Sequence, residues 1–365
     1  MARKKSKRDA LLLHVDQQVS GTTVAAAVRS MQPELSWTAA RKLVANRHVQ
    51  IDGNLCLDQG RRLKSGEVVK LHLDPLAKIP GASDIEIVFS DATLVIVNKP
   101  SGMTSVRHKE ELHWSDKRKQ FQPTLDELLP KAMEASLRPA DPKHPKNRKH
   151  DSQKHDFQLR QPSRFAGQIF PVHRLDRETS GLMVFARTRD AEAALIEQFS
   201  NHSIERVYVA IARGDVADQT IESSLVRDRG DGLRGSEKVS DTGKSKGQRA
   251  VTHVRALKTI GELTMIECRL ETGRTHQIRI HLAELGCPIC GERNYLGPPG
   301  GRVWPDNSAA PRIALHATRL GLVHPQTKQQ VAFDQPIPPD LQRWLDSLES
   351  GGPTLPAKRR RRSRN

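Results

Sequence analysis

Positive charge is unevenly distributed along this chain of 365 residues, and its distribution limits where a folded core can form. The chain carries 59 Lys and Arg against 42 Asp and Glu, a formal net charge of +17. Basic runs at residues 1–9 and 358–364 and a polar segment at 107–164 hold most of the excess, whereas residues 10–106 and 165–357 are each nearly neutral. Because highly charged segments bury little apolar surface, we expect the ordered domains in the two nearly neutral stretches.

The basic excess predicts a polyanionic partner, with nucleic acid favoured over membrane. The basic runs are either solvated tails or non-specific phosphate-binding arms. Aromatic residues make up only 4% of the chain, which argues against a single-strand binder built on stacking platforms. No stretch approaches the roughly 18 consecutive apolar residues of a membrane span. Four cysteines form no disulfide framework, so we expect a cytoplasmic protein with reduced thiols.

Residues 10–78 have the pattern of a small α+β domain. The sequence predicts one helix at Thr22–Ser30 and a second that follows a cap at Ser36. Alternating apolar residues then predict strands at His48–Asn54 and Glu67–Leu73.

This order of two helices and short strands resembles the S4 RNA-binding module. It departs from that family where an Arg-Leu-Asp usually opens the first helix and a Ser-Arg the second, so a generic α+β unit remains the alternative. The resemblance implies that basic residues around the second helix bind RNA, among them Arg41, Lys42 and Arg47.

The second ordered region, residues 84–348, opens on strand-like apolar runs and continues as alternating strands and helices. Residues 107–164 interrupt it. This segment is polar, broken by prolines and without a sustained period, so we expect a largely disordered insertion at a loop. A short helix is expected within it at Thr124–Leu137. The arm at 1–9 and the tail at 351–365 are likewise expected to be disordered.

An aspartate between two arginines stands out in the stretch VHRLDRETSGLMVFA, residues 172–186. Arg174 and Arg177 flank Asp176, and the apolar strand that follows places the carboxylate at the end of a sheet strand. Neighbouring guanidinium groups favour a charged carboxylate, which can act as a nucleophile or as a base. An ordinary salt-bridge cluster in a loop is the alternative.

A second polar cluster lies in Glu271–Leu282, which reads ETGRTHQIRIHL. If Gln277–Leu282 is extended, Arg279 and His281 share one face and the apolar residues share the other. A polar face of this kind suits gripping a phosphate or orienting a carboxylate. A basic sheet edge without such a role is the alternative. Three polar residues open the cluster: Arg274, His276 and Gln277.

Together and in this order, these stretches resemble the RluA-type RNA pseudouridine synthase family. HRLDRETSGLMVFA and TGRTHQIRIHLAELGCPICGERNY carry the resemblance, with support from NKPSGM, Arg206–Ala210 and Leu315–Thr327. The likeness covers roughly residues 84–348 without the 107–164 segment, and an S4-like module ahead of the catalytic domain is a known arrangement in that family. It implies an α+β catalytic domain around a mixed, mostly antiparallel central sheet, with the RNA cleft across its centre.

The resemblance also implies roles for individual residues. By position, Asp176 matches the catalytic aspartate, and Arg279 matches the arginine that forms a salt bridge with it. Tyr208 would stack on the target base and assist removal of the C5 proton. Arg174 would help to displace the target nucleotide from its helix, a base-flipping role, and Ile278 would contact the flipped base.

We therefore expect an enzyme that isomerises specific uridines to pseudouridine in structured RNA, with ribosomal RNA favoured over transfer RNA. The reaction breaks the C1′–N1 bond, turns the base and rejoins it through C5, and it needs no cofactor. We expect a monomer. The alternative is a catalytically inactive RNA-binding or ribosome-assembly factor on the same fold. A nucleoside hydrolase is a third reading, but the sequence lacks the Asp-rich metal site expected for one.

Signals for other chemistry are weak. The sequence contains no Walker A loop, no GxGxxG after a strand and no HExxH. Cys287 and Cys290 form a lone CxxC without a second ligand pair, at a place where the family has an ordinary turn, so we expect no metal site. Glu292 stands where the family usually has Asp, a change that preserves the charge.

Overall fold

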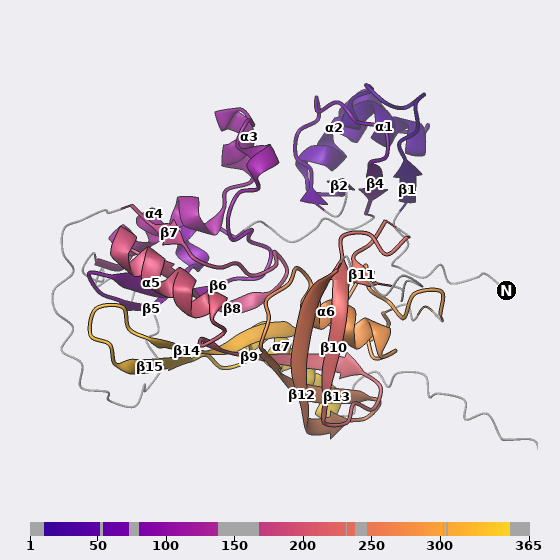
Figure 1. Cartoon of the computed structure of the whole chain (residues 1–365). Helices are drawn as coiled ribbons and strands as arrows, with labels where there is room; N and C mark the ends of the chain where they lie inside the picture. The colour runs from indigo at the N-terminus through magenta and orange to yellow at the C-terminus, as the bar shows by residue number, and fades with distance from the viewer. Residues whose placement is uncertain are drawn as a thin grey trace, which may run out of the picture. The chain divides into compact units, whose positions relative to one another are not determined.

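The computed structural model describes residues 11–51, 54–72, 80–137, 168–230, 232–237, 247–301, 303 and 306–350. The chain divides into two compact units, one made of residues 1–79 and 108–123 and the other of 80–107 and 124–365 (Figure 1). The arm at 1–9, the tail at 351–365 and the segment 138–164 lie outside the described residues. The expectations of disorder there stay predictions.

The first unit packs two helices on a small antiparallel sheet. Thr23 and Ser36 cap the two helices, because their side-chain oxygens accept hydrogen bonds from the N–H groups of Ala26 and Ala39. Apolar residues of both helices, such as Val28 and Val44, meet the strands in one core. The elements are α1 (Val24–Met31), α2 (Trp37–Ala45), β1 (Leu11–His14), β2 (Val49–Ile51), β3 (Asn54–Leu55) and β4 (Val68–Leu71), with strand order β1-β4-β2-β3. The two predicted helices are confirmed, and so are the predicted strands where the structure describes them; residues 52, 53 and 73 of those strands lie outside the described residues.

The first half of the 107–164 segment is ordered, which corrects the expectation for that part of it. Residues 109–111 form the 3₁₀ turn η2 (Lys109–Glu111), and α3 (Asp116–Phe121) follows. The Gln122 side chain donates a hydrogen bond to the carbonyl of Leu55, which ties this stretch to the first unit. The predicted helix at 124–137 is confirmed as α4 (Leu125–Leu137). Its apolar residues Leu125 and Leu129 are fully buried in the second unit.

The second unit is built on an 11-stranded sheet. Its main path runs β11-β10-β12-β13-β9-β14-β8-β6-β5, with β15 paired to β14 and β7 paired to β8. Only β14 and β8 pair in parallel among the described strands. The mixed, mostly antiparallel sheet of the sequence-based prediction is therefore confirmed. The strands are β5 (Glu86–Ser90), β6 (Leu94–Lys99), β7 (Phe170–Pro171), β8 (Ser180–Ala186), β9 (Glu205–Arg213), β10 (Gln219–Val226), β11 (Gly235–Ser236), β12 (Gln248–Ile260), β13 (Leu263–Leu270), β14 (Leu315–Val323) and β15 (Gln330–Asp334).

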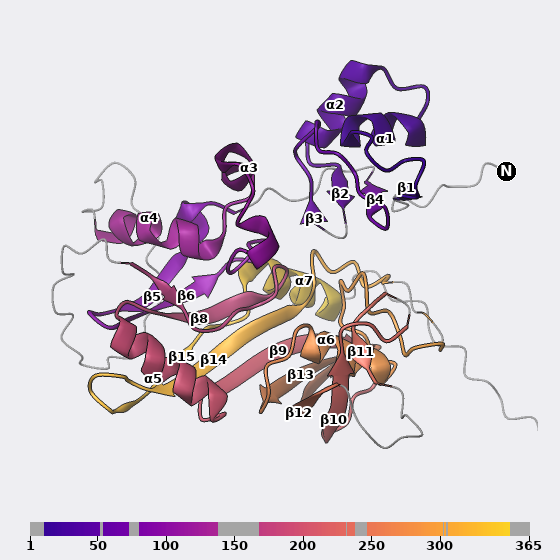
Figure 2. The same ribbon diagram turned by 45° about the horizontal axis from the view of Figure 1, so that its top comes forward.

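Helices cover both faces of the sheet around β6 and β8 (Figure 2). Leu94 and Ile96 of β6 share a core with α5 (Arg189–Ser200). Val95 and Val97, which point the other way, share a core with α4 and with α7 (Pro339–Glu349). This double cover explains why all seven residues of β8 are buried. The short turn η1 (Ala82–Asp84) precedes β5.

The stretch 277–282 is helical, and the expectation of an extended segment is wrong. It begins α6 (Gln277–Glu284). Ile278 and Leu282, one helical turn apart, enter the main core, whereas Ile280 and Ala283 enter a separate cluster against β10 and β12. Because α6 is buried between two apolar clusters, its sequence carries apolar residues on two faces. Over six residues, that pattern is the same as the alternation of a strand.

Candidate active site

Asp176 lies on the loop between β7 and β8, and the loop after β6 holds that segment in place. Ser105 Oγ donates to the Leu175 carbonyl at 2.7 Å and accepts from the Leu175 N–H at 3.1 Å. The Lys99 ammonium, which is completely buried, donates to the carbonyls of Pro100, Met103 and Arg177 at 2.8–3.1 Å. Hydrogen bonds of this kind fix the backbone on both sides of Asp176 while its carboxylate stays partly exposed, at 17%.

Arg279 of α6 bridges two carboxylates. Its Nη1 lies 3.6 Å from Asp176 Oδ2, and its Nε and Nη2 donate to the two oxygens of Glu292 at 2.7 and 2.8 Å. Glu292 also accepts backbone N–H groups from Arg293 and Asn294, both at 2.9 Å. Burial alone would raise the pKa of Glu292, but the hydrogen bonds and charge of Arg279 outweigh it, and the pKa is lowered. The guanidinium is therefore locked on one side and presents its remaining edge to Asp176.

His276 stands at the start of α6 with a left-handed backbone, φ 59°. Its Nε2 lies 3.9 Å from Asp176 Oδ1, and its Nδ1 shares a 2.7 Å hydrogen bond with the hydroxyl of Tyr295. Burial lowers the pKa of His276, so the neutral imidazole predominates at neutral pH. The carboxylate thus has a guanidinium on one oxygen and an imidazole edge on the other.

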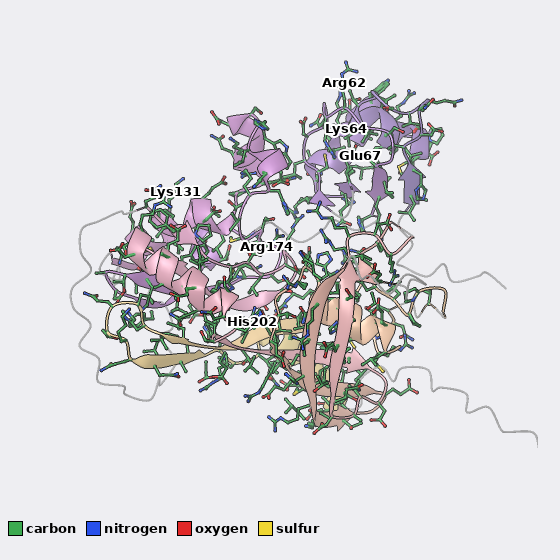
Figure 3. The ribbon with its side chains drawn as sticks, in the orientation of Figure 1. Arg62, Lys64, Glu67, Lys131, Arg174 and His202 are labelled. Atoms are coloured by element: carbon green, nitrogen blue, oxygen red, sulfur yellow. The ribbon has the colours of Figure 1, made fainter. Side chains whose placement is uncertain are left out.

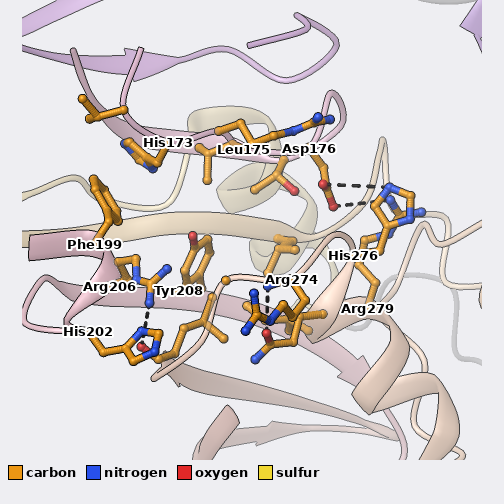
Figure 4. Close-up of a pocket in the computed structure, with 18 of the residues that line it drawn as sticks. His173, Leu175, Asp176, Phe199, His202, Arg206, Tyr208, Arg274, His276 and Arg279 are labelled. Atoms are coloured by element: carbon orange, nitrogen blue, oxygen red, sulfur yellow. Dashed lines mark hydrogen bonds and ion pairs between the residues drawn. The ribbon is translucent and has the colours of Figure 1, made fainter. Parts of the chain in front are cut away.

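Tyr208 lies on β9, and its side chain stands beside Arg206 in the pocket (Figure 4). Burial raises its pKa to about 12; the charge of Arg206 opposes that shift, and the charge of Asp176 adds to it. The phenol is therefore protonated at neutral pH and presents a neutral ring.

These residues line one cavity of about 560 Å³, within the range of small-molecule and nucleotide sites. Asp176, His276 and Arg279 lie at one end of it, and Phe199, His202 and Arg206 lie at the other (Figure 4). Arg174 is exposed at the rim, as is His202 (Figure 3). The remaining predicted residues on its wall are Tyr208, Arg274, Gln277 and Ile278.

Eight of the predicted site residues are thus brought together, although Gln277 has no free group to offer. Its oxygen accepts from Thr272 Oγ1 and from the Arg274 N–H, and its nitrogen donates to Val251 O and Thr252 Oγ1, all within 2.8–3.0 Å. It holds the 272–274 loop to β12. The other three predicted residues belong to the first unit, where Arg41 and Lys42 are exposed on α2 and Arg47 follows it with a left-handed backbone.

Sequence reasoning missed several residues that shape the site. It noted Glu292 only as a conservative substitution, although this residue positions Arg279. It gave no role to Lys99 in NKPSGM, to Tyr295 or to Arg206. For Lys99 the available signal was a charged residue directly after the apolar run LVIV, because such residues are buried only when they have partners.

The two cysteines of the CxxC stretch both lie among the described residues. Cys290 is buried, which raises the pKa of its thiol to about 12, and the Cys287 thiol contacts the carbonyl of Asp215. In the part of the chain that the structure describes, no three His, Cys, Asp or Glu side chains are grouped to hold a metal ion. Over the same residues, no helix has the length and apolar character to cross a membrane.

Comparison with known proteins identifies the family. The sequence profile of the family described as RNA pseudouridylate synthase matches residues 93–284. The ribosomal large subunit pseudouridine synthase D of Neisseria meningitidis serogroup A is 34% identical over 296 residues, 79% of this chain and 68% of that protein. The Zymomonas mobilis protein of the same name is 31% identical over 340 residues, 91% of this chain and 95% of that protein. A third, from Xylella fastidiosa, is 43% identical over 187 residues, 48% of this chain and 54% of that protein.

With the mixed sheet and its central pocket, these matches define the class of protein as an enzyme that isomerises nucleotides within RNA. The chain belongs to the RNA pseudouridylate synthase family.

Proposed function

We propose that this enzyme converts uridine to pseudouridine with Asp176 as the catalytic carboxylate. One observation carries the proposal: a partly exposed aspartate faces a pocket in which Arg279 holds its carboxylate at 3.6 Å, and Glu292 fixes that arginine in turn. Both groups behind the aspartate are nearly buried, at 7% and 1% exposure. A carboxylate paired with a guanidinium that is itself fixed by a buried acid is suited to attack or deprotonate a ribose placed over it.

The ring of Tyr208 forms the surface on which the uracil stacks. With a pKa of about 12, its phenol is a poor proton acceptor at neutral pH, so its role is to orient the base rather than to remove the C5 proton. Ile278 supplies an apolar contact beside it. Asp176, once released from its reaction with the sugar, is then the group placed to accept that proton.

RNA reaches the pocket past Arg174, whose exposed guanidinium at the rim enters the helix when the target nucleotide flips out. In the first unit, Arg41, Lys42 and Arg47 contact RNA phosphates as an S4-like module would. An exposed tryptophan, Trp37, with the Arg29 guanidinium 4.8 Å from its ring, adds an aromatic and basic surface near them. The relatives named above carry ribosomal large subunit pseudouridine synthase in their names, so we propose large-subunit ribosomal RNA as the substrate.

The experiment offers the purified enzyme two unmodified substrates, large-subunit ribosomal RNA transcribed in vitro and a pool of transfer RNA transcripts. Pseudouridine is then mapped in each. We expect formation at one or a few positions of the ribosomal RNA and none in the transfer RNA. Formation only in transfer RNA would refute the substrate. Tight RNA binding with no pseudouridine in either pool, from enzyme that is folded, would favour the inactive RNA-binding factor instead.

A further inference from the structure

Arg206 lines the same pocket on the same strand face as Tyr208. The two residues are separated by one position on β9, so their side chains leave the sheet on one side. Both lie on the pocket wall, and Figure 4 shows the guanidinium beside the tyrosine ring. Arg206 also approaches the Phe199 ring, with 5.8 Å between its Cζ and the ring centroid.

The position of this guanidinium is fixed by the backbone around it. Its Nη2 donates to the Glu271 carbonyl at 2.8 Å and to the Leu270 carbonyl at 3.4 Å. The residue that faces its Nη1 is Gly273, where a Cβ atom would come within 2.6 Å of that nitrogen. A glycine at 273 therefore leaves room for the guanidinium to lie flat against the loop.

Arg206 differs from Arg279 in its charge balance. Among the described residues, no carboxylate lies within ion-pair distance of Arg206, and its buried Nε has no hydrogen-bond partner. Burial lowers its pKa. Placing a cation in a partly desolvated pocket without a counter-charge is costly, and such an arrangement is typical of a site where negative charge arrives or develops during a reaction.

The isomerisation creates negative charge of that kind. When the C1′–N1 bond breaks, its electron pair leaves with the uracil and spreads over N1, O2 and O4. The base then turns, C5 bonds to C1′, the C5 proton is lost and N1 gains a proton, so no other reactant is consumed. The detached base needs a cation beside it that no protein carboxylate already neutralises, and Arg279 is shared between two carboxylates.

We propose that Arg206 is a further catalytic residue, whose guanidinium stabilises the negative charge on the uracil while it is detached from the ribose. This inference rests on the proposed function, since it places the uracil on Tyr208. The charge acts only after the bond begins to break, so Arg206 lowers the barrier without strengthening RNA binding.

The test uses Arg206→Gln and Arg206→Lys in the full chain, with Arg255→Gln as the matched control. Arg255 is an exposed arginine of the same sheet, paired with Glu267. Single-turnover rates are measured on two RNAs, one with uridine and one with 5-fluorouridine at the target, by loss of the original nucleoside from nuclease digests. Fluorine at C5 makes the uracil a better anion, so it reduces the need for the cation.

We expect Arg206→Gln to lose about 100–1000-fold in rate on uridine, to lose clearly less on 5-fluorouridine and to bind RNA as tightly as the wild type. Arg206→Lys keeps the charge and should lose less than Arg206→Gln on uridine. A wild-type rate for Arg206→Gln, or an equal deficit on both RNAs, would overturn the proposal, because a purely structural defect does not depend on the fluorine. If Arg206→Gln fails to fold, Arg206→Lys takes its place on the two RNAs. A smaller rate deficit on 5-fluorouridine than on uridine supports the proposal, and an equal deficit on both overturns it.

Asp176→Asn, run in parallel, distinguishes a failure of the proposed function from a failure of the role of Arg206. Activity of Asp176→Asn at the wild-type rate would refute the proposed function itself. An inactive Asp176→Asn beside a fully active Arg206→Gln would refute the role of Arg206 alone.

Discussion

Replacing Glu292 with Gln tests whether a buried acid behind the site positions Arg279. The two side chains are 1% and 7% exposed, and two charge-assisted hydrogen bonds of 2.7 and 2.8 Å join them. A glutamine has the same shape but no charge. Its NH₂ group would face the N–H donors of Arg279, Arg293 and Asn294. Breaking a buried pair of this kind costs about 3–5 kcal/mol. We expect a loss of that size in the free energy of unfolding of Glu292→Gln, measured in urea.

The matched control makes the same chemical change in an exposed pair. Glu349 and Lys258 are joined at the same 2.7 Å, but their side chains are 45% and 54% exposed. Water screens such a pair, so Glu349→Gln should cost at most about 1 kcal/mol. Similar losses in the two variants would refute the account of the buried pair.

The same variant has a signature in its pH dependence and in its rate. Because the folded protein lowers the pKa of Glu292 below its usual 4.5, the stability it contributes is present above pH 4.5 and is lost as pH falls below it. The gap in unfolding free energy between wild type and Glu292→Gln should therefore narrow in acid. In Glu292→Gln, Arg279 loses its fixed position beside Asp176, so the single-turnover rate should fall as well. Glu292→Asp keeps the charge and should restore part of the unfolding free energy and part of the rate.

Two further predictions concern the sheet beneath the site. A Cβ at residue 181 would lie 2.2 Å from the Ala317 carbonyl oxygen, so Gly181→Ala should destabilise the protein by about 3 kcal/mol or more. Gly261→Ala, also at positive φ but with nothing within 4 Å, should lose only about 1 kcal/mol in urea unfolding, and equal losses would contradict the clash. Burial lowers the pKa of His173 to about 3. As pH drops below 6.5, the imidazole therefore takes up a proton in the unfolded chain before it does so in the folded protein. The free energy of unfolding should then fall by up to about 1.4 kcal/mol per pH unit. Urea unfolding across that range should be flatter for His173→Asn, and an unchanged slope would contradict this origin.

Much of the fold was accessible from sequence because the evidence for it is local. Caps such as Ser36 and continuous apolar runs such as Leu94–Asn98 depend on neighbouring residues, and both lie where the patterns predict. Motifs also fix which residues meet, so Asp176, Tyr208 and Arg279 could be expected in one place. The helix α6 could not be predicted, because its two buried faces depend on which sheet strands pack against it.

The supporting residues of the site were hidden for a related reason. A glutamate or arginine in a sequence looks exposed until tertiary structure supplies its partners. Glu292 gains its role because the fold brings it to Arg279, thirteen positions away. Arg206 stands out because the fold gives it no carboxylate partner among the described residues, and a sequence cannot show an absence of that kind. Gln277 is the opposite case. This polar motif residue was expected to bind RNA, but its amide oxygen and nitrogen are both engaged in hydrogen bonds within the protein.

If Asp176 performs the chemistry, release of tritium from C5 measures its action directly. RNA carrying 5-tritiated uridine at the target is mixed with an excess of wild-type enzyme or of Asp176→Asn, which keeps the shape and removes the charge. We expect the wild type to release the tritium of every target uridine, whereas folded Asp176→Asn binds the RNA and releases none. Equal release by the two enzymes would contradict this role of Asp176.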